Sequence, residues 1–250
     1  MKPYHLHTNE LDVFNINIVP FYIFRIYKNK FKSLTFFNHQ DIILGGTDTS
    51  SIEVEWALAE LVANPDKMER LQDELTRVIG NTRSVDISDL PNLPYLSAVI
   101  KEAMRMHPVV PLLVPHKLTE TCELNGYEVL AGTQAYINMW AIGHDPNVWN
   151  NPWQFRPERF LGTDKISLNG GSFELAPFGS GRRICPGLPL ATLSMEFILA
   201  SLVHSFEWKA NGKPNLNEMS RFVLKLENPL VVKAYPRLAS ANLVSSSEHV

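Results

Sequence analysis

The chain has 250 residues, of which 45% are hydrophobic and 20% are charged, and its formal net charge is −3. This composition is typical of a globular protein with one sizeable core. There is no basic excess of the kind used to bind nucleic acid, and no acidic run that would indicate a solvating tail. Two cysteines, Cys122 and Cys185, cannot form a disulfide framework and fit a reducing compartment.

The first forty residues differ from the rest. Residues 1–40 are rich in Phe, Asn, Ile, Lys and Tyr and show no clear helical or strand period. Such residues share codons rich in A and T, so one hypothesis is that this segment comes from non-coding or misassigned sequence. A genuine but irregular N-terminal arm is the alternative. Its most apolar stretch, 18–24, is too short to span a membrane, and no signal-cleavage pattern follows it. We therefore expect no membrane anchor in this chain.

Regular helical patterns begin at residue 41. A helical stripe of apolar residues runs through 41–64. The next helix starts with a proline at residue 65 and ends at Gly80, which are typical start and stop signals. A third helix is predicted over about 95–106, between two prolines.

The second part of the sequence alternates short strands, loops and one long helix. Residues 109–140 indicate short strands joined by glycine turns. A long loop is expected over 143–162. Residues 188–208 form a helix that is apolar nearly all round, so it should be buried. Residues 221–235 favour a terminal hairpin, and 239–250 a frayed polar tail.

A cysteine-containing loop precedes the long helix. The sequence FGSGRRICPG occupies residues 178–187. A free cysteine is usually a small buried hydrophobe. Cys185, however, would face the free N–H groups and positive end of the following helix. Arg182 and Arg183 add positive charge, which also favours the thiolate. The glycines of the loop would let the backbone approach a bulky flat group.

Such a thiolate would be a nucleophile or a metal ligand. A nucleophile needs a base, and no Cys–His signature is visible. Zinc needs three or four ligands at short spacing, which Cys122 and the scattered histidines do not supply. A haem iron needs only one thiolate from the protein. Haem ligation by Cys185 therefore suits the loop best.

The loop matches the haem-binding signature Phe-x-x-Gly-x-Arg-x-Cys-x-Gly of the cytochrome P450 superfamily. The matching residues are Phe178, Gly181, Arg183, Cys185 and Gly187. Three further motifs occur in the family's order. GGTDTS at 45–50 resembles the oxygen-binding bend of the I helix, KEAMR at 101–105 resembles the Glu-x-x-Arg of the K helix, and PERF at 157–160 resembles the meander motif. The resemblance covers about 41–236.

The resemblance implies a mainly α fold with small β-sheets, namely the C-terminal half of the cytochrome P450 fold. Residues 41–238 would form a partial domain that runs from the I helix to the C-terminal hairpin. Family members are considerably longer than this chain. A truncated, catalytically inactive remnant or an incomplete gene model is therefore the alternative to a working enzyme.

The implied activity is that of a haem-thiolate monooxygenase, which inserts one oxygen atom from O2 into a hydrophobic small molecule. Its cofactor would be haem b (iron protoporphyrin IX), and NADPH-cytochrome P450 reductase would supply electrons. The amino-acid sequence resembles those of plant microsomal members of the geraniol-hydroxylase-like or N-methylcoclaurine-hydroxylase-like type. Those enzymes oxidise terpenoids and alkaloids. Such enzymes lie on the cytosolic face of the endoplasmic reticulum membrane. For a chain without an anchor, the cytoplasm is the alternative.

The resemblance also assigns roles to the residues around the haem. Cys185 would be the axial ligand of the iron. Asp48 and Thr49 would relay protons to dioxygen, although a helix cap or a locally satisfied bend is the alternative. Arg183 and His116 would bind haem propionates; for His116, a structural role is the alternative.

Two further groups complete the expected site. Glu102 and Arg105 share a helix face and would join Arg159 in a buried network behind the haem, although a solvated ion pair is the alternative. The substrate pocket would be apolar, and plain core is the alternative for its residues. The residues expected to line it are Gly45, Gly46, Val109, Val110, Leu113, Val114, Phe222 and Val223.

Overall fold

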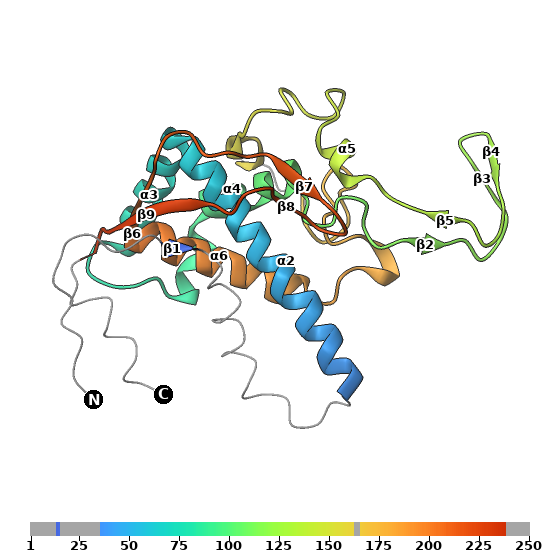
Figure 1. The fold of residues 1–250 in the computed structure, drawn as a ribbon, viewed down its shortest axis with the longest axis horizontal. Helices are drawn as coiled ribbons and strands as arrows, with labels where there is room; N and C mark the ends of the chain where they lie inside the picture. Colours follow the sequence, from blue (N-terminus) through green and yellow to red (C-terminus); the bar gives the residue numbers. More distant parts are fainter. Residues whose placement is uncertain (1–13, 16–35, 163–165, 239–250) are drawn as a thin grey trace.

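The computed structural model describes residues 14–15, 36–162 and 166–238 (Figure 1). Side chains are described over 45–162 and 166–238. The helices are α2 (Phe36–Ala63), α3 (Pro65–Ile79), α4 (Pro94–Met106), α5 (Met139–Gly143) and α6 (Leu188–Ser205), with short 3₁₀ helices η1 (Ile87–Asn92), η2 (Pro157–Phe160) and η3 (Gly181–Arg183). The mainly helical fold class with small sheets is confirmed.

The strands form small antiparallel sheets. They are β1 (Phe14–Asn15), β2 (His116–Lys117), β3 (Cys122–Leu124), β4 (Tyr127–Val129), β5 (Gln134–Ala135), β6 (Phe206–Ala210), β7 (Glu218–Ser220), β8 (Leu224–Leu226) and β9 (Val231–Pro236). Strand β9 is central in the order β1-β9-β6, and the other pairs are β2-β5, β3-β4 and β7-β8. In Figure 1, β2 and β5 form an arm that carries the β3–β4 hairpin away from the helices.

The core lies where α2 crosses α3, α4 and α6. These helices contact one another directly, and Figure 1 shows α2 running across α6. Trp56 and Leu58 of α2, Leu71 of α3, Ile100 of α4 and Leu199 of α6 are fully buried. Burying a large apolar side chain contributes about 1.5–3 kcal/mol, so this helix cluster holds the walls of the site in place.

Local sequence signals set several element ends as predicted. Helix α3 begins with Pro65 after Asn64 and ends before Gly80, which has φ 83°. The β3–β4 turn contains Asn125 and Gly126, both with positive φ. Helix α2, however, begins at Phe36 and not at residue 41, since the sequence has no proline or other breaker there. Most of 1–40, and the tail 239–250, lie outside the described residues.

The long apolar helix differs from the prediction in two ways. It ends at Ser205, and strand β6 begins at Phe206. Its C-terminal half is buried, but Leu190 and Leu193 near its start are 42% and 39% exposed. The helix is also long and apolar enough to cross a membrane by composition, which the sequence analysis did not expect. Because core helices of soluble proteins pass the same test, this finding alone is weak evidence for a span.

The predicted terminal hairpin at 221–235 is wrong. Its first strand, β8, pairs with β7, and its second, β9, pairs with β6 and β1. The segment between them contains Pro229, and the N–H of Leu230 donates to Glu55 on α2 at 3.1 Å. This anchor separates the two strands, so each finds its partner elsewhere.

Candidate functional site

A cavity of about 400 Å³ lies among α2, the segment after α4, the Cys185 loop and α6. This volume is within the range of small-molecule sites. The described residues that line it are Gly45, Thr49, Ser50, Glu53, Met104, Val109, Val110, Leu113, Val114, His116, Ile137, Pro177, Phe178, Gly179, Ser180, Arg183, Cys185, Pro186, Ala191 and Met195. Most are apolar, and the few polar groups come from different segments.

The Cys185 loop folds back on itself before α6. The N–H of Cys185 donates to the carbonyl oxygen of Phe178 at 2.9 Å. Gly179 and Gly181 have φ values of 75° and 65°, which favour glycine. Helix α6 starts three residues after Cys185, at Leu188. The thiol is exposed and belongs to the cavity wall, so a group bound in the cavity can reach it.

Two basic side chains lie on the same wall. Arg183 comes from η3, and His116 comes from β2, where its backbone pairs with Ala135. Both side chains are exposed. A guanidinium and an imidazole on an otherwise apolar wall can bind carboxylates by charge-assisted hydrogen bonds.

Asp48 and Thr49 face different spaces. The Thr49 hydroxyl donates to the carbonyl oxygen of Gly45 at 2.8 Å and lines the first cavity. Asp48 instead lines a second cavity of about 370 Å³, together with Arg221 and Lys225. Successive residues of an α-helix point about 100° apart, so α2 separates these two side chains. Asp48 and Thr49 therefore do not meet at the first cavity.

The structure brings together only part of the predicted site. On the first cavity lie Gly45, Thr49, Val109, Val110, Leu113, Val114, His116, Phe178, Arg183 and Cys185. Not on its wall are Gly46, Asp48, Gly181, Gly187, Phe222 and Val223. Phe222 is 66% exposed and Val223 lines the second cavity, since both follow β7 on the far side of α2. Gly181 and Gly187 shape the loop around Cys185.

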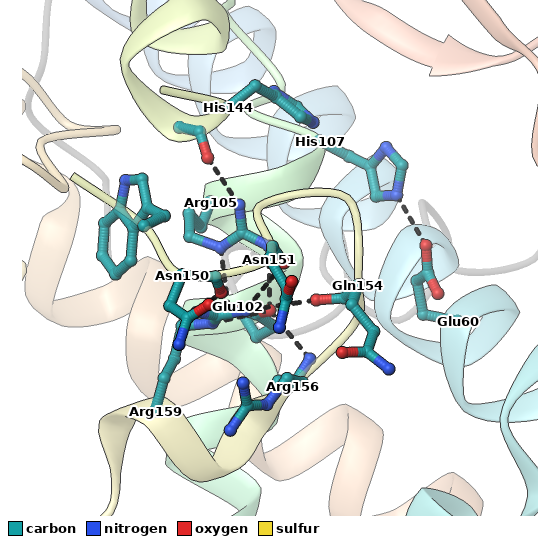
Figure 2. A network of polar contacts seen from close by, with 12 residues as sticks. Glu60, Glu102, Arg105, His107, His144, Asn150, Asn151, Gln154, Arg156 and Arg159 are labelled. Atoms are coloured by element: carbon teal, nitrogen blue, oxygen red, sulfur yellow. Dashed lines mark hydrogen bonds and ion pairs between the residues drawn. The ribbon is translucent and has the colours of Figure 1, made fainter. Parts of the chain in front are cut away.

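Glu102, Arg105 and Arg159 meet in a buried cluster (Figure 2). Arg105 forms a two-bond pair with Glu102, Nε to Oε2 at 2.8 Å and Nη2 to Oε1 at 2.9 Å. Arg159 Nε donates to Glu102 Oε1 at 3.0 Å. Both Glu102 and Arg105 side chains are 0% exposed. Their burial excludes the alternative of a solvated ion pair.

The rest of this cluster consists of backbone groups. Arg105 also donates to the carbonyl oxygen of Gly143, at the end of α5. Arg159 donates to the carbonyl oxygens of Asn150 at 3.0 Å and Gln154 at 3.2 Å (Figure 2). Helix α4, the end of α5 and the 150–159 loop are thus tied to one carboxylate. Such a network is costly to break because each buried charge depends on the others.

The sequence analysis did not single out His107, which follows α4. Its Nε2 lies 2.8 Å from Glu60 Oε1, and its Nδ1 lies 2.7 Å from Glu218 Oε1. Burial lowers the pKa of His107, but hydrogen bonds to Glu218 and Glu60 outweigh burial, and the pKa is raised above 6.5. The two carboxylates of Glu60 and Glu218 therefore favour the protonated form of His107.

Glu53 is the second residue that the sequence analysis missed. Its side chain belongs to the cavity wall, is 3% exposed as a residue, and its buried Oε1 has no hydrogen-bond partner among the described residues. Burial raises the pKa of Glu53 to about 8, and the charge of His107 offsets only part of the rise. Glu53 lies four residues before Ala57 of the apolar stripe, so the two share a helix face. This spacing could have predicted that Glu53 is buried.

The groups on the cavity wall fit a haem. A haem presents a flat apolar ring, one iron and two carboxylates. The cavity offers apolar walls, the Cys185 thiol, and the basic side chains of Arg183 and His116. Within the described ranges, no group of three or more His, Cys, Asp or Glu side chains is arranged to hold a metal ion. A single thiolate ligand is the donor set that haem requires.

Comparison with known proteins decides the family. The cytochrome P450 family model matches residues 36–234. The chain belongs to the cytochrome P450 family. The family implies haem as the prosthetic group, and the resemblance noted in the sequence is confirmed.

Relatives of this cytochrome P450 include plant enzymes. It is 53% identical over 187 residues to ferruginol synthase of Salvia miltiorrhiza, covering 74% of this chain and 38% of the relative. It is 45% identical over 199 residues to geraniol 8-hydroxylase of Catharanthus roseus, covering 78% and 40%. The chain thus spans about two fifths of the length of these relatives.

A solved relative has the same fold. A zebra fish cytochrome P450 with progesterone is 36% identical and superposes with a TM-score of 0.71. The match covers 78% of this chain and 44% of the zebra fish chain. This agreement supports the arrangement of helices that surrounds the cavity.

Proposed function

We propose that this chain supplies the iron-ligating side of a haem-thiolate monooxygenase, which inserts one oxygen atom from O2 into a hydrophobic small molecule. One observation carries this proposal: Cys185 and Thr49, from segments far apart in the sequence, line one cavity of about 400 Å³. Haem b, when bound, supplies the iron at which dioxygen is activated. Cys185 would hold that iron through its thiolate, which would donate electron density to the metal.

The other groups on the wall orient the cofactor and keep water out. Arg183 and His116 would bind the propionate groups, because both side chains offer N–H donors to a carboxylate. Phe178, Val109 and Leu113, which line the cavity, would pack against the apolar ring and help to exclude water. The buried pair of Glu102 and Arg105 holds the 150–159 loop against α4, so it is a positioning network and not a catalytic one.

Thr49 would supply a hydroxyl hydrogen-bond donor to dioxygen from the cavity wall. Its hydroxyl now donates to Gly45 on the preceding turn, and rotation about χ1 turns it toward the cavity. Asp48, beside Arg221 and Lys225 in the second cavity, would be the solvent-side member of the proposed relay. Because α2 separates the two side chains, a relay between them would need carrier groups that connect the second cavity with the first.

The substrate class follows from the apolar wall and from the relatives. The cavity carries a mainly apolar lining, which suits terpenoid or alkaloid-like molecules. The names ferruginol synthase and geraniol 8-hydroxylase belong to plant relatives. Electrons come from NADPH through NADPH-cytochrome P450 reductase, at the cytosolic face of the endoplasmic reticulum membrane.

A carbon monoxide difference spectrum tests the proposal. The chain is expressed with haem supplied, reduced and exposed to carbon monoxide. We expect the far-red-shifted Soret band of a thiolate-ligated carbonyl haem. Cys185→Ser should abolish this band, while Cys122→Ser, at the other exposed cysteine, should retain it. The alternative, a chain that keeps the family's residues without a working site, predicts no such band in the unaltered chain.

A further inference from the structure

Glu53 carries the one carboxyl group among the described residues that line the cavity. Glu53 is 3% exposed, and its Oε1 is buried without a hydrogen-bond partner among the described residues. It lies on α2 one turn beyond Thr49, on the same wall. Ser50, also on this wall, is 5% exposed. Helix α2 therefore presents a row of polar groups to a cavity that is otherwise apolar.

The neighbouring cation does not satisfy this carboxyl. His107 is close enough to affect Glu53 electrostatically. Both ring nitrogens of His107 are already engaged, one with Glu60 at 2.8 Å and one with Glu218 at 2.7 Å. Because an imidazole has no third donor, His107 cannot satisfy Glu53, whose side chain belongs to the cavity wall.

A purely structural role does not explain an acid at this position. A methionine or leucine would fill similar space without desolvating a carboxyl group. An unsatisfied buried polar group destabilises the folded chain. The unsatisfied carboxyl group therefore destabilises the folded chain, and a bound group that forms a hydrogen bond with it would remove this destabilisation.

The protonation state decides which partner is complementary. Burial raises the pKa of Glu53 to about 8, so the group is mostly a neutral carboxylic acid at pH 7. A neutral carboxyl group both donates and accepts a hydrogen bond. A hydroxyl group does the same, and it adds no charge to an apolar cavity.

We infer that Glu53 is the polar recognition point of this cavity, and that its carboxyl group binds the hydroxyl group of an otherwise apolar alcohol. The inference deepens the proposed function, on which it rests for the binding of a substrate beside haem, at the α2 wall of this cavity. Thr49 would act on dioxygen, and Glu53 would fix the orientation of the alcohol. A hydrocarbon would leave the carboxyl group without a hydrogen-bond partner, and so would bind less tightly.

Binding of two ligands of the same carbon skeleton tests the inference. Geraniol carries a terminal hydroxyl, and dimethyloctadiene is its deoxygenated hydrocarbon. Affinities for the haem-supplied chain are measured by equilibrium dialysis. We expect geraniol to bind about tenfold more tightly than the hydrocarbon. Equal affinities, or no binding of geraniol, would overturn the inference.

Variants at Glu53 separate recognition from packing. Glu53→Met should remove most of the preference for geraniol, while Glu53→Gln should retain part of it because an amide also donates and accepts. Glu69→Gln, which removes an exposed carboxylate of α3, should leave both affinities unchanged. If Glu53→Met weakens both ligands equally, the role is packing and the inference fails.

The carbon monoxide spectrum keeps the two proposals distinguishable. A thiolate band without a preference for geraniol would support the monooxygenase and overturn the role of Glu53. A preference for geraniol that Glu53→Met removes, in a chain without the thiolate band, would support Glu53 and contradict the proposed function.

Discussion

The imidazole of His107 lies flat on the indole of Trp56, with ring centroids 3.9 Å apart and an angle of 6° between the planes. Trp56 is fully buried on α2, and its Nε1 donates to the carbonyl oxygen of Leu224 on β8 at 3.2 Å. His107 also contacts Glu60 on α2 and Glu218 on β7 through its two ring nitrogens. One stacked pair therefore joins α2, the end of α4 and the β7–β8 sheet beside the cavity.

The contribution of His107 to stability should depend on pH. Its pKa is raised in the folded chain, so this contribution is fully present below about 6.5 and is lost as pH rises through the folded-state pKa. We expect His107→Gln to destabilise the chain by about 1.5–3 kcal/mol near pH 6, and by less near pH 9. Urea unfolding at both pH values measures the difference. A loss that grows with pH would contradict the prediction.

His144 provides a control of opposite sign. Burial lowers the pKa of His144, and a hydrogen bond to Trp140 offsets part of that effect. Its neutral form is favoured by folding, so protonation below pH 6.5 weakens the folded state. His144→Gln should therefore relieve destabilisation at low pH, in contrast to His107→Gln.

Glu53 should give the chain a second pH dependence. Between its ordinary pKa of 4.5 and its folded-state pKa of about 8, the unfolded chain has released a proton that the folded chain retains. Raising the pH through this window therefore favours unfolding, by up to about 1.4 kcal/mol for each pH unit. Glu53→Gln should flatten this slope. Parallel slopes for the two proteins, in urea unfolding across the window, would show that Glu53 ionises normally.

Removing Arg105 should be severe. Arg105→Ala leaves the buried carboxylate of Glu102 with only part of its partners, and such losses cost about 3–5 kcal/mol. We expect loss of folding or of haem uptake, measured by circular dichroism and haem absorbance. Arg70→Ala, at a half-exposed pair with Glu158, should cost about 1 kcal/mol or less. Normal haem incorporation in Arg105→Ala would contradict the network's role.

Gly143 leaves no room for a side chain. A Cβ atom at this position would clash with the backbone carbonyl oxygen of Arg105, whose side chain donates to Gly143 in return. Gly143→Ala should lower the free energy of unfolding by about 1–3 kcal/mol. In Gly45→Ala, the added Cβ meets nothing within 4 Å, so the matched change should be neutral or slightly stabilising. Thermal unfolding of both variants measures the contrast.

Local signals in the sequence predicted local features well. Pro65 and Gly80 mark both ends of α3, and the spacing of Glu102 and Arg105 places them on one helix face. Pairings between distant segments were harder to predict. Strands β8 and β9 read as a hairpin, but the partners β6 and β7 depend on the anchor between Leu230 and Glu55.

The site divides in the same way. The Cys185 loop could be read from its motif because backbone turns and helix start are encoded within ten residues. The separation of Asp48 from Thr49 follows from helix geometry, which a motif read as a string does not convey. Glu53 and His107 were passed over because a polar residue near an apolar stripe is usually a solvated one, and only the packed neighbours show otherwise.

The cavity's walls come from segments that begin at Gly45 and end at Met195, so it exists only when the whole helix cluster is assembled. Any molecule that binds in the cavity therefore stabilises the folded state of the entire chain. Its binding free energy adds to the folding equilibrium as RT ln(1 + [L]/Kd). Resistance to proteolysis should accordingly rise with the concentration of haem or of substrate. The fraction of chain that remains uncleaved by a protease would then report the fractional occupancy of the cavity.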